Sequence, residues 1–256
     1  MISNFRFVPI DQMLIACSPI RDYDQEEFVY FGSDTLMFRN LIASRVPSLV
    51  ENTLEIGCGT GFLSIWMAQR SRLVTATDIS QRALTITRVN AALNDAVNVA
   101  AIESDVYSEV AGRFEVIISN PPYMFLPDDE SKRIHAYGGH FGMNITRRIL
   151  IGLDKHLSAN GVALIFSDSY MLENGTDTLC DLLLATLRGQ PWQIIATQFD
   201  YQPVKGHAEF YRQHSVRHAI RYLVTIRRAP SFSFTCDKLG AASRMIQNSK
   251  LRFSKP

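Results

Sequence analysis

The chain has 256 residues and a formal net charge of +1 at pH 7, and 46% of its residues are hydrophobic against 20% that are charged. This composition can bury a core, which excludes a disordered chain, and the longest apolar runs fall far short of the roughly 20 residues that span a bilayer. The 4 cysteines form no CxxC pair and no metal-ligand spacing, so we expect no disulfide framework and no membrane span, and a reduced cytoplasmic compartment fits best.

The first 50 residues are expected to form an extension rather than a domain. They contain one predicted helix, at 31–46, which is capped by Ser33 or Asp34. The stretch before this helix is too short for a second domain. We therefore expect residues 1–50 to pack on the core that follows.

Short β-rich runs alternate with helical runs in the middle of the chain, which indicates an α/β fold with helices on both faces of a parallel sheet. Because the last two predicted strands have no helix between them, the last strand should be antiparallel. We expect this domain to comprise residues 51–230 and a basic C-terminal tail to comprise residues 231–256. Helices are predicted at 62–70, 80–93, 143–157 and near 172–188. The seven predicted strands are at 53–57, 73–79, 98–104, 114–120, 162–167, 193–199 and 221–228.

A glycine-rich turn, LEIGCGTG, joins the first predicted strand of this domain to its first helix. Gly57, Gly59 and Gly61, with Cys58 among them, let the backbone pass close to a ligand. Glu55 precedes the first glycine by two positions and can take a positively charged ligand group, such as an ammonium. Dinucleotide enzymes carry a similar GxGxxG turn, but the spacing here differs from that pattern by one residue.

Acidic residues also follow the next two strands. Asp78, with Ile79 beside it, ends the second strand, where a carboxylate can accept hydrogen bonds from both hydroxyls of a ribose; a helix cap is the alternative. Asp105 follows the third strand and can accept from an adenine amino group while the Val106 N–H faces a ring nitrogen; a plain loop aspartate is the alternative. Since open α/β sheets bind ligands at the carboxyl ends of their strands, the sequence predicts one cofactor site here.

The fourth predicted strand ends on Asn-Pro-Pro-Tyr, next to the predicted cofactor site. Asn120 offers a side-chain carbonyl to the cofactor and acceptor, Pro121 offers a backbone carbonyl, and Pro122 stiffens the turn. Two such acceptors can hold one planar NH2 group, and Tyr123 gives a flat face on which an amide or a base can stack. The alternative is that Pro-Pro merely ends a strand, which the flanking Asn and Tyr argue against.

This order of motifs resembles the class I S-adenosylmethionine-dependent methyltransferases over residues 50–228. The resemblance implies a seven-stranded Rossmann-like sheet with an antiparallel last strand, and S-adenosylmethionine as the cofactor. Asn-Pro-Pro-Tyr resembles the [N/D/S]-P-P-[Y/F/W] signature of amino-methyltransferases, whose targets include glutamine side-chain amides and exocyclic amines of bases. It implies an N-methyltransferase in which the acceptor nitrogen is held by Asn120, Pro121, Pro122 and Tyr123.

Residues 135–165 look like the segment after this motif in the HemK-type glutamine methyltransferases, which modify protein release factors. Gly138, Gly139 and Gly142, a helix and NGVALI follow in the same order. Those enzymes carry an N-terminal helical domain for substrate recognition, which the first 50 residues here do not supply. The resemblance implies a planar amide nitrogen in a protein, peptide or small metabolite. A base amino group in RNA or DNA (adenine N6 or guanine N2) and a non-catalytic cofactor-binding protein stay open as alternatives.

The C-terminal part of the chain is basic. Residues 201–256 contain 11 of the 26 Lys and Arg residues but 2 of the 25 Asp and Glu residues. Such a segment fits an acidic partner, nucleic acid included, or a solvated face that balances an acidic body. His214 and His218 have the i,i+4 spacing of metal ligands on a helix, but no third ligand is evident, so no metal site is expected.

Overall fold

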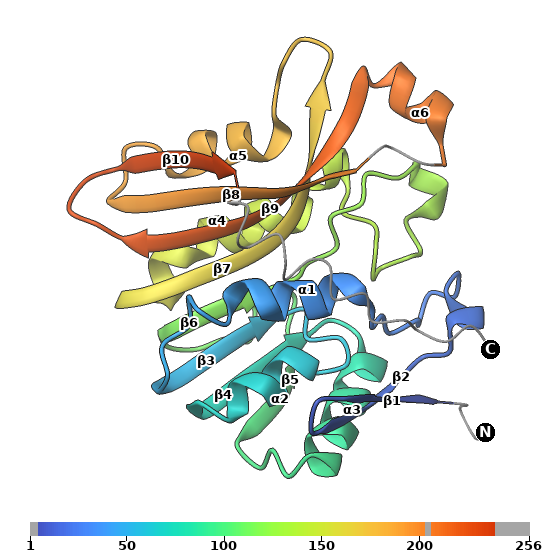
Figure 1. Ribbon diagram of the computed structural model, residues 1–256, viewed down its shortest axis with the longest axis vertical. Helices are drawn as coiled ribbons and strands as arrows, with labels where there is room; N and C mark the ends of the chain where they lie inside the picture. Colours follow the sequence, from blue (N-terminus) through green and yellow to red (C-terminus); the bar gives the residue numbers. More distant parts are fainter. Residues whose placement is uncertain (1–4, 203–205, 239–256) are drawn as a thin grey trace.

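The computed structural model describes residues 5–202 and 206–238, and its main feature is one mixed sheet of eight strands (Figure 1). In chain order these strands are β3 (Val50–Ile56), β4 (Ser71–Asp78), β5 (Val99–Glu103), β6 (Phe114–Ser119), β7 (Leu157–Leu172), β8 (Trp192–Gln202), β9 (Val216–Arg228) and β10 (Ser233–Lys238). Their spatial order is β10-β8-β9-β7-β6-β3-β4-β5. β3 to β7 pair in parallel, and β9 is antiparallel to both of its neighbours, which confirms the prediction for the last strand of the domain.

The sheet has one strand more than the seven expected. β10 lies in the segment expected to be a tail, and it pairs in parallel with β8, from Ser233 opposite Gln193 to Lys238 opposite Gln198. An edge strand pairs on one side only and needs no continuous apolar run, so its sequence carries little signal. The prediction of seven strands is therefore wrong, because it omits β10. The sheet extends past residue 230, the predicted end of the domain.

Three neighbouring strands are longer than expected: β8 (Trp192–Gln202, predicted at 193–199), β9 (Val216–Arg228, predicted at 221–228) and β7. β7 extends from Leu157 to Leu172, whereas 162–167 was predicted, and it pairs with β9 along most of that length. The added residues of β7 include polar ones with a weak strand propensity. They adopt the strand conformation because they pair with neighbouring strands of the sheet. A helix of six residues, α6 (Ala208–Gln213), stands between β8 and β9, where no helix was expected.

Helices cover both faces of the sheet, as predicted (Figure 1). α1 (Ser33–Ile42), α2 (Phe62–Ala68) and α3 (Gln81–Leu93) lie on one face, and α4 (Asn144–His156) and α5 (Thr178–Leu187) lie on the other. Phe38 and Met67 pack with Phe166 in the first core cluster, and Leu153 packs with Trp192 in the second. Over the two described ranges, no helix is both long and apolar enough to cross a bilayer.

The residues before α1 form a hairpin that lies against α3. It consists of β1 (Arg6–Ile10) and β2 (Met13–Cys17). Asn90 Oδ1 accepts a hydrogen bond from Ala16 N at 2.7 Å, and Asn90 Nδ2 donates to Thr60 O at 2.8 Å. One buried side chain therefore ties the hairpin to the glycine-rich turn. The hairpin was not predicted, because its Asp-Gln turn lacks the Asn-Gly or Asp-Gly signal of two-residue hairpins.

The chain order of the sheet reverses between β3 and β6. From β3 the chain moves outward to β4 and β5, and it then returns to the other side of β3 as β6. The loops at the carboxyl ends of these two neighbours diverge, which leaves the crevice where open α/β sheets bind ligands.

The described residues also form three short 3-10 helices outside the sheet: η1 (Ile20–Asp22), η2 (Asp128–Glu130) and η3 (His140–Gly142).

Candidate active site

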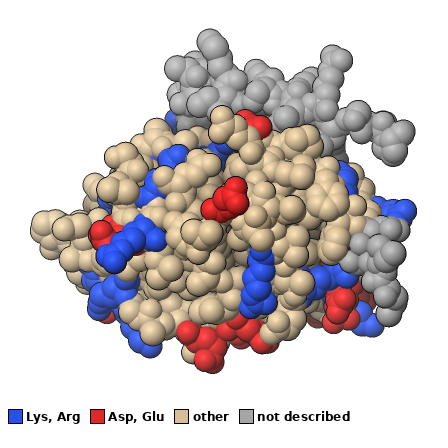
Figure 2. Space-filling view, turned by 90° about the horizontal axis from the view of Figure 1, so that it is seen from below, with Lys and Arg blue, Asp and Glu red and all other residues tan. Residues whose placement is uncertain are grey.

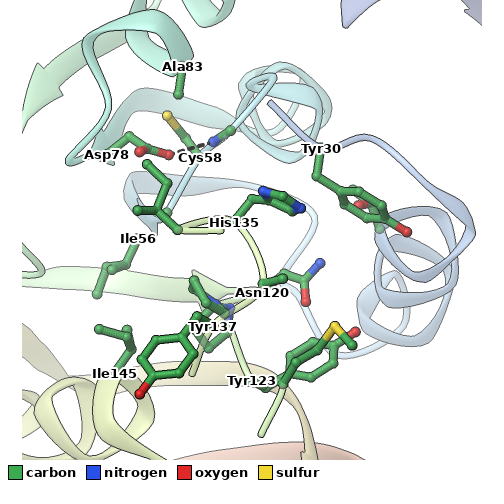
Figure 3. Close-up of a pocket in the computed structure, with 18 of the residues that line it drawn as sticks. Tyr30, Ile56, Cys58, Asp78, Ala83, Asn120, Tyr123, His135, Tyr137 and Ile145 are labelled. Carbon is green, nitrogen blue, oxygen red and sulfur yellow. Dashed lines mark hydrogen bonds between the residues drawn. The ribbon is translucent and has the colours of Figure 1, made fainter. Parts of the chain in front are cut away.

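A cavity of about 700 Å³ lies at the carboxyl ends of β3, β4 and β6 (Figure 3). Residues from four separate turns face this one space, which is the arrangement expected of a site built on several strands. Of the predicted site residues, Gly61 alone does not line this cavity. The predicted site residues that do line it are Glu55, Gly57, Cys58, Gly59, Asp78, Ile79, Asp105, Val106, Asn120, Pro121, Pro122 and Tyr123.

The glycine-rich turn between β3 and α2 has a left-handed backbone. Gly57 has φ 73°, and a Cβ on it would meet nothing within 4 Å, so this side of the turn is open toward the cavity. Gly61 also has φ 73°, but its Cβ would lie 2.7 Å from Thr87 Cγ2. Glycine at position 61 therefore lets α3 pack closely against the turn. Gly61 thus packs against α3 and does not line the cavity, and its contact with a cofactor stays a prediction.

Glu55 is buried at the end of β3, with 2% of its surface exposed. Its Oε2 accepts a hydrogen bond from Ser64 Oγ of α2. Burial raises the pKa of Glu55 from its ordinary 4.5 to about 8, although the Ser64 bond partly opposes this. A cationic group in the cavity would favour the ionised form, which is the chemistry predicted for this residue.

Asp78 is held by backbone N–H groups at the end of β4. Its Oδ2 accepts from Gly59 N and its Oδ1 accepts from Ser80 N, both at 2.9 Å (Figure 3). The cap of α3 is Ser80, whose Oγ accepts from Ala83 N at 3.2 Å, so the alternative reading of Asp78 as the cap does not hold. Ile79 beside it is 59% exposed, which leaves an apolar surface at the cavity.

Asp105 and Val106 form the wall of the cavity after β5. Asp105 Oδ1 accepts a hydrogen bond from Arg148 Nη1 at 2.8 Å, and both side chains are about half exposed. Val106 has φ 59°, a left-handed conformation that is rare for a β-branched residue and costs on the order of 1–3 kcal/mol. Such strain persists where the surrounding structure imposes it, and here it occurs at the predicted adenine position.

Asp34 joins the two ends of the Asn-Pro-Pro-Tyr turn. Its Oδ2 accepts from Asn120 Nδ2 at 3.4 Å and from the Tyr123 hydroxyl at 3.2 Å. A carboxylate can only accept, so Asn120 must direct its NH2 group to Asp34 and its Oδ1 elsewhere. Within the described residues, Asn120 Oδ1 and Asp34 Oδ1 are both shielded from solvent and have no hydrogen-bond partner.

Asp34 was expected only as a helix cap, and that prediction is wrong. Gly32 is the N-cap of α1 and no side chain caps the helix, whereas Asp34 lies in its first turn and lines the cavity. An acidic residue in a first helical turn is common, so the sequence holds no signal for its second role.

Glycines after the motif allow the segment that contains them to approach the backbone of the motif closely. Met124 N donates to Ala136 O at 2.9 Å, and Gly138 N donates to Met124 O at 2.8 Å. A Cβ on Gly142, which has φ 73°, would lie 2.0 Å from Tyr123 O. The glycines that the sequence analysis noted thus permit a close approach to the motif rather than contact with a ligand.

An ion pair between Arg221 and Asp168 lies next to Tyr123 of the motif. Arg221 of β9 donates to both carboxylate oxygens of Asp168, at 2.7 and 3.1 Å, and its guanidinium carbon lies 5.9 Å from the Tyr123 ring centroid. Burial raises the pKa of Asp168, and the bonds from Arg221 oppose this rise. Both residues line the cavity, and neither was predicted because they come from strands distant in sequence.

An aromatic wall, which we define as Tyr23, Phe28, Tyr30 and His135, also lines the cavity. The His135 ring is 5.0 Å from both Tyr23 and Phe28, and it lies nearly parallel to Tyr30 at 6.4 Å. His135 belongs to the segment 124–137, and Met124, Ser131 and 134–137 of this segment line the cavity. In the described part of the chain, no group of three or more His, Cys, Asp or Glu side chains could hold a metal ion.

Comparison with known proteins identifies the family. The family model described as "Methyltransferase small domain" matches residues 31–168. A putative protein N5-glutamine methyltransferase of Methanocaldococcus jannaschii is 35% identical over 148 residues, which are 55% of this chain and 72% of that protein. The ribosomal RNA small subunit methyltransferase C of Yersinia pestis is 32% identical over 122 residues, which are 47% of this chain but only 31% of that protein.

Solved structures agree on the fold. The E. cuniculi Mtq2–Trm112 complex, described as responsible for methylation of the eRF1 translation termination factor, contains a chain with a TM-score of 0.54 and 16% identity. The match covers 79% of this chain and 99% of that one. With its family model over more than half of its length, the chain belongs to the methyltransferase small domain family, and it is an S-adenosylmethionine-dependent methyltransferase.

Proposed function

We propose that this enzyme methylates a planar NH2 nitrogen of the glutamine amide type, in a protein, a peptide or a small metabolite. The observation that carries the proposal is the free Oδ1 of Asn120, which Asp34 orients away from itself beside the glycine-rich turn. The similarity to a putative glutamine methyltransferase supports the same acceptor class.

The cavity fits the cofactor of the family. The open side of Gly57 can admit a ligand close to the backbone, and the buried Glu55 carboxyl has a hydroxyl rather than a cation as its partner. When bound, S-adenosylmethionine supplies an electrophilic methyl group. We propose that the residues that hold it are Glu55, Gly57, Cys58, Gly59, Asp78, Ile79, Asp105, Val106 and Asn120.

The Asn-Pro-Pro-Tyr turn would position the acceptor nitrogen. Asn120 Oδ1 and the Pro121 carbonyl can each accept one of its two N–H groups, which holds the nitrogen and aims its out-of-plane lone pair at the methyl group. The same oxygens stabilise the positive charge that develops on nitrogen during transfer. The proton can leave after the methyl group has moved, so the chain needs no strong general base. Asp34 would act as a positioning residue through Asn120 and Tyr123.

Substitution of the motif asparagine tests this mechanism. Asn120→Ala should bind the cofactor normally and lose turnover by about 10²- to 10³-fold, the usual cost of removing one preorganised hydrogen-bonding group. A matched control is Asn174→Ala, because Asn174 lies in an exposed turn outside the cavity. Unchanged turnover in the Asn120 variant would contradict the mechanism.

The acceptor class is tested with methyl-labelled S-adenosylmethionine and a cell extract divided into macromolecular and small-molecule fractions. Label that protease removes indicates a protein amide, and label that nuclease removes indicates a base. Label confined to the small-molecule fraction indicates a metabolite acceptor.

A base amino group in RNA is the second candidate, supported by the similarity to a ribosomal RNA methyltransferase and by the basic C-terminal part. Part of that charge is neutralised, since Arg221 pairs with Asp168 and Arg228 pairs with Asp154. Figure 2 shows basic and acidic side chains interspersed on one face, with no broad patch of one sign. A steep fall in binding as salt rises would favour this candidate.

A further inference from the structure

His135 is the one member of the aromatic wall whose polar side-chain atoms are both buried and unpaired. Both of its ring nitrogens are shielded from solvent, and neither has a hydrogen-bond partner among the described residues. A buried polar atom without a partner costs on the order of 1–3 kcal/mol. A phenyl ring at this position would keep the ring contacts without that cost, so packing alone does not account for an imidazole here.

The unpaired atoms of His135 have counterparts on two other residues of the same cavity. Asn120 Oδ1 and Asp34 Oδ1 are likewise shielded and unpaired in the described part of the chain, and all three residues line the same cavity. Figure 3 shows His135 beside Tyr30 and labels Asn120 in the same pocket. Tyr30 lies near both residues, because its ring lies nearly parallel to that of His135, and burial together with the nearby charge of Asp34 raises the pKa of its hydroxyl.

His135 is neutral at physiological pH. Burial, reinforced by the nearby Arg133 charge, lowers its pKa to about 4, whereas Asp24 acts weakly in the opposite direction. A neutral imidazole has one N–H donor and one acceptor nitrogen. Among the four unpaired atoms at the cavity, a nitrogen of His135 therefore supplies the single donor, and the other three are acceptors.

This set of atoms complements a primary amide. Such a group has two N–H donors and one carbonyl oxygen that must itself accept a hydrogen bond. In the proposed function, Asn120 Oδ1 and the Pro121 carbonyl take the two donors. The carbonyl oxygen then needs a donor from another residue of the cavity, and the rings of the aromatic wall can stack on the flat amide.

We propose that His135 binds the acceptor by donating a hydrogen bond to the carbonyl oxygen next to the methylated nitrogen, so that the site selects carboxamides over amines that lack a carbonyl. This inference rests on the proposed function and adds a specificity-determining residue to it. A buried donor of this kind discriminates strongly, because an acceptor without the carbonyl leaves the N–H unpaired.

A binding titration tests the contact without turnover. The full chain, labelled with ¹⁵N in histidine and saturated with S-adenosylhomocysteine, is titrated with propionamide and separately with propylamine. Propionamide should shift the His135 ring nitrogens, and propylamine should not. His156 is an internal control, because its Nδ1 is 3.1 Å from Gly112 O and it does not line the cavity. If propionamide leaves His135 unmoved, or if both compounds move it equally, the inference is overturned.

Turnover of a glutamine-containing peptide separates this inference from the proposed function. His135→Phe keeps the ring contacts but removes the donor, and it should raise KM about 10- to 100-fold with unchanged binding of S-adenosylhomocysteine. His135→Gln, which retains an N–H donor, should recover part of this loss. An unchanged KM in the Phe variant, with an active wild type, overturns the role of His135 alone. A wild type that methylates no amide overturns the proposed function, and the titration then still decides whether His135 binds an amide.

Discussion

The part of the cavity proposed to hold the cofactor and the part proposed to hold the acceptor differ in how their polar groups are satisfied. On the cofactor side, Asp78 is paired with the backbone of Gly59, 19 residues away, and Glu55 is paired with Ser64, 9 residues away. On the acceptor side, Asn120 meets Asp34 across 86 residues, and unpaired atoms remain. Asp78 and Glu55 thus find their partners within one local stretch, whereas Asn120 depends on a distant segment and retains an unpaired atom for a ligand.

The difference teaches where specificity resides. Groups that pair with their own backbone hold their geometry before any ligand arrives, which suits a cofactor shared by a whole family. Groups left without a partner gain most from a ligand that matches them, which suits discrimination between acceptors. The predictions below test this contrast, beginning with the largest expected effect.

Substitution of the glycine that abuts the motif should disrupt the acceptor half most. Gly142→Ala places a Cβ 2.0 Å from Tyr123 O at φ 73°, so we expect a loss of about 3 kcal/mol in unfolding free energy and little remaining turnover. Gly112→Ala is the control, because it has φ 83° with nothing within 4 Å, and it should cost only about 1 kcal/mol. Urea unfolding measures both. Equal losses would mean that φ strain, and not the close approach, requires glycine at position 142.

Removal of the charge that orients the motif should leave the cofactor half intact. Asp34→Asn can donate as well as accept, so it no longer dictates the orientation of the Asn120 amide. We expect kcat to fall about 10- to 100-fold while binding of S-adenosylhomocysteine stays within about twofold. Asp11→Asn, at an exposed carboxylate paired with Arg39, is the control. A parallel loss of cofactor binding would show that the halves are not separable.

Protonation of Glu55 should make cofactor binding release a proton. With its pKa raised to about 8 by burial, Glu55 is largely protonated at pH 7 in the free protein, and a cationic ligand group favours its ionised form. Affinity should therefore rise with pH up to about 8. Calorimetry in buffers of different ionisation enthalpy measures the released proton. Glu55→Gln should abolish the release and weaken binding about tenfold, whereas Glu51→Gln, at an exposed residue of the same strand, should change neither.

The smallest effect concerns stability in acid. The folded-state pKa of His135 is about 4, below its ordinary 6.5, so the unfolded chain takes up a proton first as pH falls. This residue leaves stability unaffected above about pH 6.5, and it lowers the unfolding free energy as pH drops from 6.5 toward 4. His135→Phe removes this contribution, so urea unfolding should show the variant gaining on the wild type across that window. If the unfolding free energies of the two proteins fall in parallel with pH, the His135 imidazole is more solvated in solution than in the structure.

Much of the fold could be predicted from the sequence, since most strands, the main helices and the antiparallel β9 follow from local patterns. The hairpin of β1 and β2, the six-residue α6 and the edge strand β10 could not. α6 and β10 bury little apolar surface and depend on neighbouring elements already in place, whereas the hairpin is buried in the core but lacks a turn signal.

The candidate site divides in the same way. Glu55, Gly57, Asp78 and Asn120 could be found because strand ends and spaced glycines mark them in the chain. Arg221 and Asp168 could not, because they face the cavity only through the pairing of β7 with β9, where Asp168 lies opposite Arg221.

The sequence by itself determined the α/β fold, the glycine-rich turn and the place of Asn-Pro-Pro-Tyr at the end of a strand, because each depends on residues near one another in the chain. Only the tertiary structure decided that Asp34 hydrogen-bonds to the motif and that His135 lines the same cavity. The physical reason is that hydrogen bonds and ring contacts between distant segments follow from the packing of helices and strands, which no local pattern records.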